Sequence, residues 1–599
     1  MKTAGDAITA EVVRAAFALA AEEAGIVVVR AAHSTFIAEG ADACATVLDT
    51  RGRLVAQSAA TTLMHGASLR ATLPALLEDV PLDGMRPGDV YVTNDPYRGG
   101  IHANDLLVFR PVFAGRRSGG VGGRPGRRSE VDPNDAANRP TWFAGTLIHV
   151  ADVGGVAAAG LAALATDVFA EGLLLPPVAL VRQGEAVPEV WRILERNSRS
   201  PDRVLGDVRA LVAGVNVMTA RIEELVDGYG VDAVAAEVDG SIDYARTRMR
   251  DELRRLPRGR YHGSFAIEGD GVDPDRTYDV RVTVDVGDGD VSVDFDGTSP
   301  QARGSINSST SQTLSAVVYA IRCFVDPTIP MNEGCFEPVR VRAPRGCLVN
   351  PDPPAACGGR IVTMCAAIEA IIAALAEARP DHAVAASSLI HVYALAGASD
   401  GGRPWLTLGY EFGGIGARNG ADGPDATGPY VLGGRSVITQ VEPLEASLPV
   451  LVREYRLRAD SGGPGTFRGG LGVETTIEVL SDATLTSRGD RIALPPRGSH
   501  GGAHGEPGRS SVHRTAGEET LDARAAGVAL RAGDRYVLRT SGGGGFGPPR
   551  RRDPAAVLAD VLDGRCTPAH AEQVYGVVLD TTGVAVDEQA TARLRTDAS

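Results

Sequence analysis

A polar, turn-rich segment at residues 94–105 interrupts two apolar runs and limits how this chain can fold. Residues 88–93 and 106–109 on either side are rich in apolar and β-branched side chains, so each is predicted to be a strand. Gly99-Gly100 lets the backbone approach a ligand closely. The segment ends in His102 and Asp105, two metal donors three residues apart. A single pair of this kind also suits a hydrogen-bonded structural histidine, and that alternative stays open.

A second pair of the same form follows the next predicted strand. The apolar run 142–148 leads into His149 and Asp152, again three residues apart, and a Gly-Gly bend follows. Two such pairs on adjacent strands make a metal site with three or four ligands reasonable. The strands are separated by residues 115–139, which are rich in Gly, Arg, Asp and Ser and are predicted to form an exposed insertion.

The basic residues exclude several kinds of chemistry. Lys2 is the only lysine, so 59 of the 60 basic residues are arginine. A Walker-type phosphate loop needs a lysine, and so do pyridoxal enzymes and Schiff-base aldolases. The folded body of this chain therefore cannot perform those reactions itself.

Length and charge set the broad class. With 599 residues, the chain should form two to four domains. The net charge of -15 and a pI near 5.3 argue against a general binder of nucleic acid or anionic membranes. The seven cysteines form no CxxC pair, which fits reduced thiols better than disulfides or a zinc cluster. The chain shows neither a signal peptide nor a run of about twenty apolar residues, so we expect a cytoplasmic protein.

Hydrophobic periodicity predicts a large, multidomain α+β fold. An N-terminal α/β region at 1–256 would hold the metal site, and His65 would either cap the helix at 67–78 or face that site. A mixed region at 257–440, a β-rich region with glycine-rich loops at 441–550 and a helical tail at 551–599 would follow. The predicted helices are 8–30, 67–78, those within 202–256, 311–324, 361–377, 554–563 and 567–574; predicted strands include 43–48, 53–56 and those within 261–341.

The glycine-rich stretches are interpreted as structural. Residues 542–547 formally match GxGxxG, but Pro548 follows where a dinucleotide-binding loop would open a helix. His500 and His504 lie in another glycine-rich stretch, where an exposed loop is favoured over a metal site.

Several motifs in order along nearly the whole chain resemble the hydantoinase B/oxoprolinase family, which includes N-methylhydantoinase B-like proteins and the α subunits of acetone carboxylase-type enzymes. The motifs are Asn94-Asp95-Pro96-Tyr97-x-Gly-Gly-x-His102-x-x-Asp105, His149-x-Ala-Asp152-x-Gly-Gly, Glu171-Gly172-x-x-x-Pro176-Pro177, Asp294-Phe295-x-Gly297-Thr298, Gly413-Gly414-x-Gly416-Ala417-Arg418, Arg468-Gly469-Gly470-x-Gly472 and Gly542-Gly543-Gly544-Gly545-Phe546-Gly547.

This resemblance implies a divalent metal, manganese or zinc and possibly iron, with His102, Asp105 and His149 as its ligands. Asp152 would be a fourth ligand or would orient an imidazole. Asn94 would hold substrate or metal-bound water, as would Asp95. ATP would be bound by a separate hydantoinase A-type subunit. Leu147 departs from the family, in which an arginine often stands two residues before the second histidine.

The resemblance also implies a function. The chain would be the metal-containing subunit of a heteromeric ATP-dependent hydrolase of cyclic amides such as hydantoins, 5-oxoproline or lactams. The partner would phosphorylate the amide oxygen, and water would then attack here while Asp95 or Asp152 handles the proton. One alternative is an alpha-type subunit of an ATP-dependent acetone or acetophenone carboxylase, and another is a non-catalytic scaffold. We expect a hetero-oligomer that binds a small molecule but neither nucleic acid nor membranes.

Overall fold

The computed structural model describes residues 7–59, 65–113, 139–399, 401–427 and 438–596. The predicted insertion at 115–139 lies outside the described residues except for Arg139. The N-terminal part is built on a seven-stranded antiparallel sheet in the order β2-β1-β5-β4-β3-β6-β7. Its strands are β1 (Ala43–Asp49), β2 (Leu54–Gln57), β3 (Val90–Thr93), β4 (Asp105–Val112), β5 (Trp142–His149), β6 (Val178–Arg182) and β7 (Glu185–Ala186).

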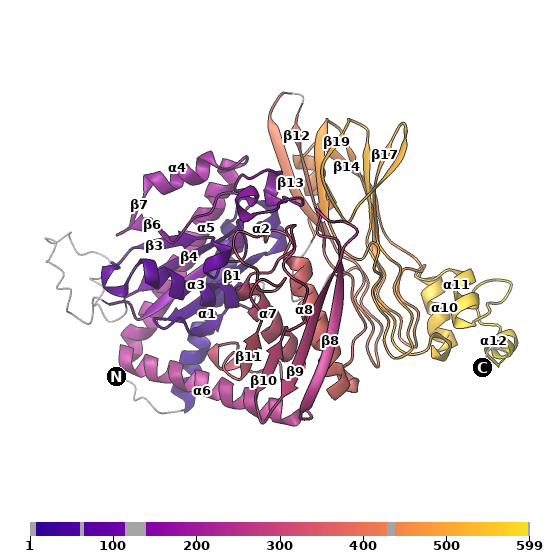
Figure 1. The fold of residues 1–599 in the computed structure, drawn as a ribbon, viewed down its shortest axis with the longest axis horizontal. Helices are drawn as coiled ribbons and strands as arrows, with labels where there is room; N and C mark the ends of the chain where they lie inside the picture. The colour runs from indigo at the N-terminus through magenta and orange to yellow at the C-terminus, as the bar shows by residue number, and fades with distance from the viewer. Residues whose placement is uncertain (1–6, 60–64, 114–138, 400, 428–437, 597–599) are drawn as a thin grey trace.

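Helices cover both faces of this sheet, so its strands are apolar on both sides (Figure 1). Leu106 and Val108 of β4 pack in one core with α1 (Ala7–Ala31) and α5 (Pro201–Tyr229). Leu107 and Phe109 point the other way, into a core shared with α3 (Gly66–Asp79). The continuous apolar runs in the sequence follow from this double burial. The remaining helices of this part are α2 (Thr35–Gly40), α4 (Pro188–Arg196) and α6 (Val231–Arg255).

A second sheet, in the order β11-β10-β9-β8, adjoins the same core. It comprises β8 (Gly259–Glu268), β9 (Thr277–Val286), β10 (Val291–Asp294) and β11 (Val339–Arg342), with helices α7 (Thr310–Arg322) and α8 (Ile361–Ala378). By length and composition α8 is apolar enough to cross a membrane, but 78% of it is buried inside the protein against β8, β9 and α7. Its composition is therefore that of a core helix.

The C-terminal part is a β-sandwich with a helical tail (Figure 1). One sheet has the order β13-β12-β16-β19 and the other β14-β15-β20-β17-β18, and their side chains share one core. The strands are β12 (His391–Ala398), β13 (Pro404–Glu411), β14 (Val450–Leu457), β15 (Val473–Val479), β16 (Ala483–Arg488), β17 (Arg509–Arg514), β18 (Gly517–Leu521), β19 (Arg524–Leu530) and β20 (Arg535–Arg539). The helices are α9 (Val441–Ser447), α10 (Pro554–Leu562), α11 (Pro568–Tyr575) and α12 (Glu588–Thr596). The sandwich thus begins at β12, within the region predicted as 257–440.

Below the sandwich lies a glycine bundle, formed by residues 413–424, 461–472, 498–506 and 542–547 (Figure 1). These segments are neither helix nor strand, yet they hydrogen bond side by side: the Gly543 N–H donates to Gly470 and the Gly470 N–H to Ile415. A Cβ on Gly470 would lie 1.9 Å from the carbonyl oxygen of Pro424, so a side chain there has no room. The sequence predicted structural turns here; the glycines are structural, but their role is close packing of backbones.

Candidate metal centre

The pairing of β4 with β5 brings the two predicted histidine-carboxylate pairs together. Asp105, the first residue of β4, stands opposite His149, the last residue of β5, and Asp105 Oδ1 lies 3.1 Å from His149 Nδ1. His102 Nε2 lies 3.2 Å from Asp105 Oδ2 and 3.1 Å from His149 Nδ1. One donor atom from each residue lies within 4.8 Å of the others, and all three side chains are buried. We refer to these residues as the His-Asp-His triad.

The segment before His102 is held in place by its own polar side chains. Asn94 Nδ2 donates to the carbonyls of Ala103 at 2.6 Å and Leu173 at 2.8 Å, and Asn94 Oδ1 accepts from the Leu175 N–H at 2.6 Å. Asn94 therefore ties residues 94–104, here called the triad loop, to residues 173–175. The geometry gives no support to the predicted contact between Asn94 and substrate.

Asp95 has a local role in the same segment. Its Oδ1 accepts from the Tyr97 N–H at 2.9 Å and caps the short helix η3 (Pro96–Arg98). The next turn is fixed from α7, because the hydroxyls of Ser309 and Ser311 donate to the Gly100 carbonyl at 3.1 and 2.9 Å. The triad loop is thus preorganised by backbone contacts from several elements.

A buried arginine stands beside the triad. Arg360, at the start of α8, donates from Nη2 to Asp105 Oδ2 at 3.1 Å. Burial alone would raise the pKa of Asp105, but His102 and Arg360 beside it hold that pKa well below its usual value. Burial and the Arg360 charge also keep the pKa of His102 well below its usual value. The triad therefore presents a carboxylate and a neutral imidazole, the forms that bind metals.

The structure places Asp152 apart from the triad's donor atoms. Its Oδ1 accepts from Arg199 Nη1 at 2.9 Å and from the Ala159 N–H at 3.1 Å, and its Oδ2 accepts from the Arg199 N–H at 2.6 Å. With both oxygens engaged, Asp152 organises residues 152–159 and 199. A metal ligand would have to give up these bonds.

His65 precedes the first turn of α3 and is buried, as the capping alternative requires, although its side chain makes no capping hydrogen bond. Its Nδ1 lies 3.7 Å from Asp42 Oδ1.

His504 Nδ1 accepts from the Gly498 N–H, and His500 stacks on Phe546. Within the described part of the chain, the triad is the one group of three or more histidine, cysteine or acidic side chains close enough to share a metal ion.

Two further buried residues, which the sequence did not single out as site residues, adjoin Arg360. Glu171 Oε1 accepts from the Gly358 N–H at 2.5 Å, and burial raises the pKa of Glu171 to about 7. Arg488, at the end of β16, lies near the same glycine, with its Nη1 3.7 Å from the position that a Cβ would take there. Glu171 lay within a recognised motif, but Arg360 is 255 residues from Asp105 and no local pattern links them.

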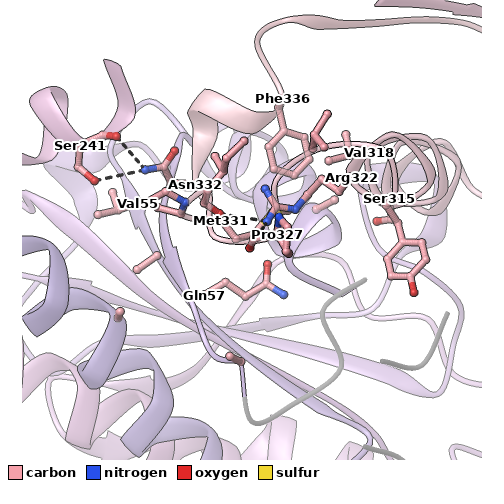
Figure 2. Close-up of a pocket in the computed structure, with 18 of the residues that line it drawn as sticks. Val55, Gln57, Ser241, Ser315, Val318, Arg322, Pro327, Met331, Asn332 and Phe336 are labelled. Carbon is pink, nitrogen blue, oxygen red and sulfur yellow. Dashed lines mark hydrogen bonds between the residues drawn. The ribbon is translucent and has the colours of Figure 1, made fainter. Parts of the chain in front are cut away.

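A separate cavity of about 680 Å³ lies between α1, β2, α6 and α7 (Figure 2). Its wall is mainly apolar, with Val55, Val318 and Phe336 among the lining residues. Two of its polar side chains are engaged: Asn332 Nδ2 donates to Ser241, and Arg322 donates to backbone carbonyls at Pro327 and Ile329. No residue of the triad lines this cavity, so it offers space without the metal donors.

Comparisons with known proteins show what the chain as a whole resembles. Residues 6–549 match the model of the family described as hydantoinase B/oxoprolinase. The B-type subunit of a putative D-/L-hydantoinase from Pseudomonas sp. strain NS671 is 29% identical over 98% of each chain. The beta subunit of the caprolactamase of Pseudomonas jessenii is 32% identical over 85% of each chain.

Two solved structures share the fold. The crystal structure of the ATP-dependent caprolactamase from Pseudomonas jessenii matches with a TM-score of 0.87 and 29% identity, covering 99% of this chain and 100% of that one. The nucleotide-free structure of acetone carboxylase matches with a TM-score of 0.85 and 20% identity, covering 99% of this chain and 82% of that one. At that identity the second likeness concerns the fold alone.

Proposed function

Because this chain belongs to the hydantoinase B/oxoprolinase family, we propose that it is the metal-containing subunit of a heteromeric, ATP-dependent hydrolase of cyclic amides. The observation that carries the proposal is the buried His-Asp-His triad at the joined ends of β4 and β5. The relatives named as subunits of a hydantoinase and of a caprolactamase support the substrate class.

The triad suits a divalent ion. Two imidazoles and one carboxylate are borderline and hard donors that bind zinc, manganese or iron, and a catalytic site of three protein ligands leaves positions open for water or substrate. An ion held by His102, Asp105 and His149 would supply Lewis-acid chemistry and lower the pKa of nearby water. Arg360 would keep the Asp105 carboxylate oriented and ionised.

Proton transfer is better assigned to Glu171 than to Asp95 or Asp152. A proton carrier needs a pKa near the working pH, and burial gives Glu171 a pKa of about 7. Asp152 is instead committed to Arg199 and Asp95 to the turn at Tyr97. Glu171 would accept a proton from attacking water and return one to the leaving nitrogen.

The nucleotide chemistry is assigned to another chain. The lone lysine, Lys2, stands at the N-terminus, so a lysine-bearing phosphate loop is absent from the sequence. The relatives are named as subunits, and the caprolactamase structure is described as ATP-dependent. A hydantoinase A-type partner would therefore activate the amide with ATP, and this subunit would hydrolyse the activated product.

The test is reconstitution with the ATP-binding partner. The complex should hydrolyse at least one of a panel of hydantoins, 5-oxoproline and lactams only when ATP is present. The His102→Ala complex should lose this turnover while the partner still binds ATP. Turnover by the partner alone, or undiminished turnover with His102→Ala, would refute the assignment.

The carboxylase alternative is tested in the same assay by adding bicarbonate and ketones. ATP-dependent carboxylation of a ketone, with no amide hydrolysis, would show that the chain is a carboxylase subunit. A scaffold role is less well supported, because a scaffold has no need of three buried metal donors in contact with one another.

A further inference from the structure

The guanidinium of Arg488 is buried but lacks the partners that such a group needs. Arg488 is 8% exposed, and neither its Nε nor its Nη1 has a hydrogen-bond partner among the residues that the structure describes. Arg360 is also 8% exposed, and its Nε likewise has no partner there. Burying a guanidinium without hydrogen bonds opposes folding, so such groups are retained where they serve a ligand.

The unpaired atoms lie around Gly358. A Cβ built on Gly358 would lie 2.8 Å from Glu171 Oε1 and 3.7 Å from Arg488 Nη1, so both side chains lie against this glycine and a larger residue would displace them. Glu171 Oε2, buried at the same place, also has no partner in the described structure. Arg360 connects this group to the triad, because its Nη1 donates to the Gly358 carbonyl while its Nη2 donates to Asp105.

Among the described residues around Gly358, unpaired hydrogen-bond donors outnumber unpaired acceptors. Arg360 and Arg488 are both buried here, whereas Asp105 supplies one carboxylate and already pairs with Arg360. Arg524 stands directly opposite Arg488 in the β16–β19 pairing and has the buried acids Asp490 and Glu268 beside it, so these acids do not compensate Arg488. The acid near Arg488 is Glu171, and its one unpaired oxygen cannot serve the unpaired Nε and Nη1 of Arg488 and the Nε of Arg360 together. An anion is the missing partner.

We propose that Arg488, with Arg360 beside it, binds an anionic oxygen group, either carboxylate or phosphoryl, of the molecule that enters the metal centre. Guanidinium groups recognise both through charge-assisted N–H donors, and the Nε and Nη1 donors of Arg488 have no acceptor in the described structure. The anion site stands on the geometry alone. Its assignment to the substrate rests on the proposed function, where a phosphorylated amide enters and a carboxylate leaves.

The experiment uses the full-length chain after removal of divalent metals, and measures its melting temperature with increasing inorganic phosphate, acetate or chloride at matched ionic strength. Phosphate or acetate should raise the melting temperature above the chloride control, and the anion that does so identifies the group. In Arg488→Gln the anion should bind at least about tenfold more weakly, as expected for loss of a charge-assisted pair. Without anion, this variant should be as stable as the parent or more so, because it removes an unpaired buried charge.

Arg468→Gln is the matched control. Arg468 is also buried, but it pairs with Asp425 and Asp560, so its loss should lower stability and leave the anion effect intact. Arg488→Lys keeps the charge but replaces the planar guanidinium donors with an ammonium group, so it should fold and lose most of the anion-induced shift. The proposal is overturned if neither anion exceeds chloride, or if Arg488→Gln or Arg488→Lys keeps the full shift. Because no turnover is measured, these outcomes are independent of the amide-hydrolase assay.

Discussion

Asp105 and His149 stand opposite each other in the β4–β5 pair, with Oδ1 and Nδ1 3.1 Å apart. Because residues directly opposite in an antiparallel pair lie on the same face of the sheet, this register aims both side chains at one point. A shift by one residue would send one of them to the other face. The site therefore depends on a strand register that double burial of the sheet specifies strongly.

Loss of one triad imidazole should abolish metal binding. His102→Ala is expected to lower the affinity for zinc or manganese by about 100-fold or more, since even the partners of metal ligands contribute 10–100-fold. Metal content after dialysis, measured by mass spectrometry, checks this. His504→Ala, in the glycine bundle, is the control and should retain the parent's content. Equal metal content in both variants would remove the metal-centre assignment.

Asp152→Asn should separate a ligand from a positioning role. If Asp152 organises the loop through Arg199 and Ala159, metal content should stay at the parent level while turnover by the reconstituted complex falls. Turnover should fall because residues 152–159, which follow His149, would be held less firmly once the contacts of Asp152 with Arg199 and Ala159 are weakened. A metal content that drops as far as in His102→Ala would show instead that Asp152 is a ligand.

Asp105→Asn should destabilise the metal-free protein by about 3–5 kcal/mol, because it leaves the buried charge of Arg360 uncompensated. Urea unfolding in the presence of a chelator gives the free energy. Asp294→Asn is the comparison, since its partner Arg342 is exposed and such surface pairs contribute little to stability. Similar losses in the two variants would contradict the view that Asp105 compensates Arg360.

Glu411 should make stability depend on pH. Burial raises its folded-state pKa to about 7, and Tyr455 donates to its Oε2 at 2.8 Å. The folded protein therefore holds a proton that the unfolded chain releases between about pH 4.5 and 7, so this residue's contribution to stability falls as pH rises through that window. Relative to the parent, Glu411→Gln should gain stability from pH 5 to pH 8, measured by urea unfolding. A constant difference between the two proteins would refute the shift.

Gly470→Ala should disrupt the glycine bundle. Its Cβ would lie 1.9 Å from the Pro424 carbonyl oxygen, so backbones must separate at a cost of about 3 kcal/mol or more. Gly240→Ala in α6 is the matched control, because its Cβ meets nothing within 4 Å and alanine favours a helix by about 1 kcal/mol. Melting temperatures should move in opposite directions. A stable Gly470→Ala protein would mean that the bundle tolerates side chains.

Local patterns predicted the elements around the site well. The helices α1, α3, α5 to α8, α10 and α11 and the strands β1 to β5 lie close to their predicted ranges, because apolar periodicity and turn residues are local signals. The adjacency of the two strands that carry His102, Asp105 and His149 followed from their apolar character and the polar insertion between them. The mixed fold class is confirmed as well.

Contacts between distant segments were beyond that reasoning. Arg360 and Arg488 reach the site from α8 and β16. A single buried arginine belongs to no periodic sequence pattern, so neither position could be predicted. β12 pairs with β16 across many intervening residues, so the place of β12 and its neighbour β13 in the sandwich had no local sign. Asn94 and Asp152 carry polar side chains that suit ligands, but backbone groups occupy them, which only the folded chain reveals.

The glycine bundle constrains how this protein can be made. Gly543 follows Ile415 by 128 residues, and Gly470, which bonds to both, lies between them. Translation at about 5–20 residues per second leaves the earlier segment without its neighbours for several seconds. A stop codon before residue 542 would remove the segment whose Gly543 bonds to Gly470, so the bundle would lack one of its four segments. A cell would therefore obtain either the whole C-terminal half or an aggregation-prone fragment.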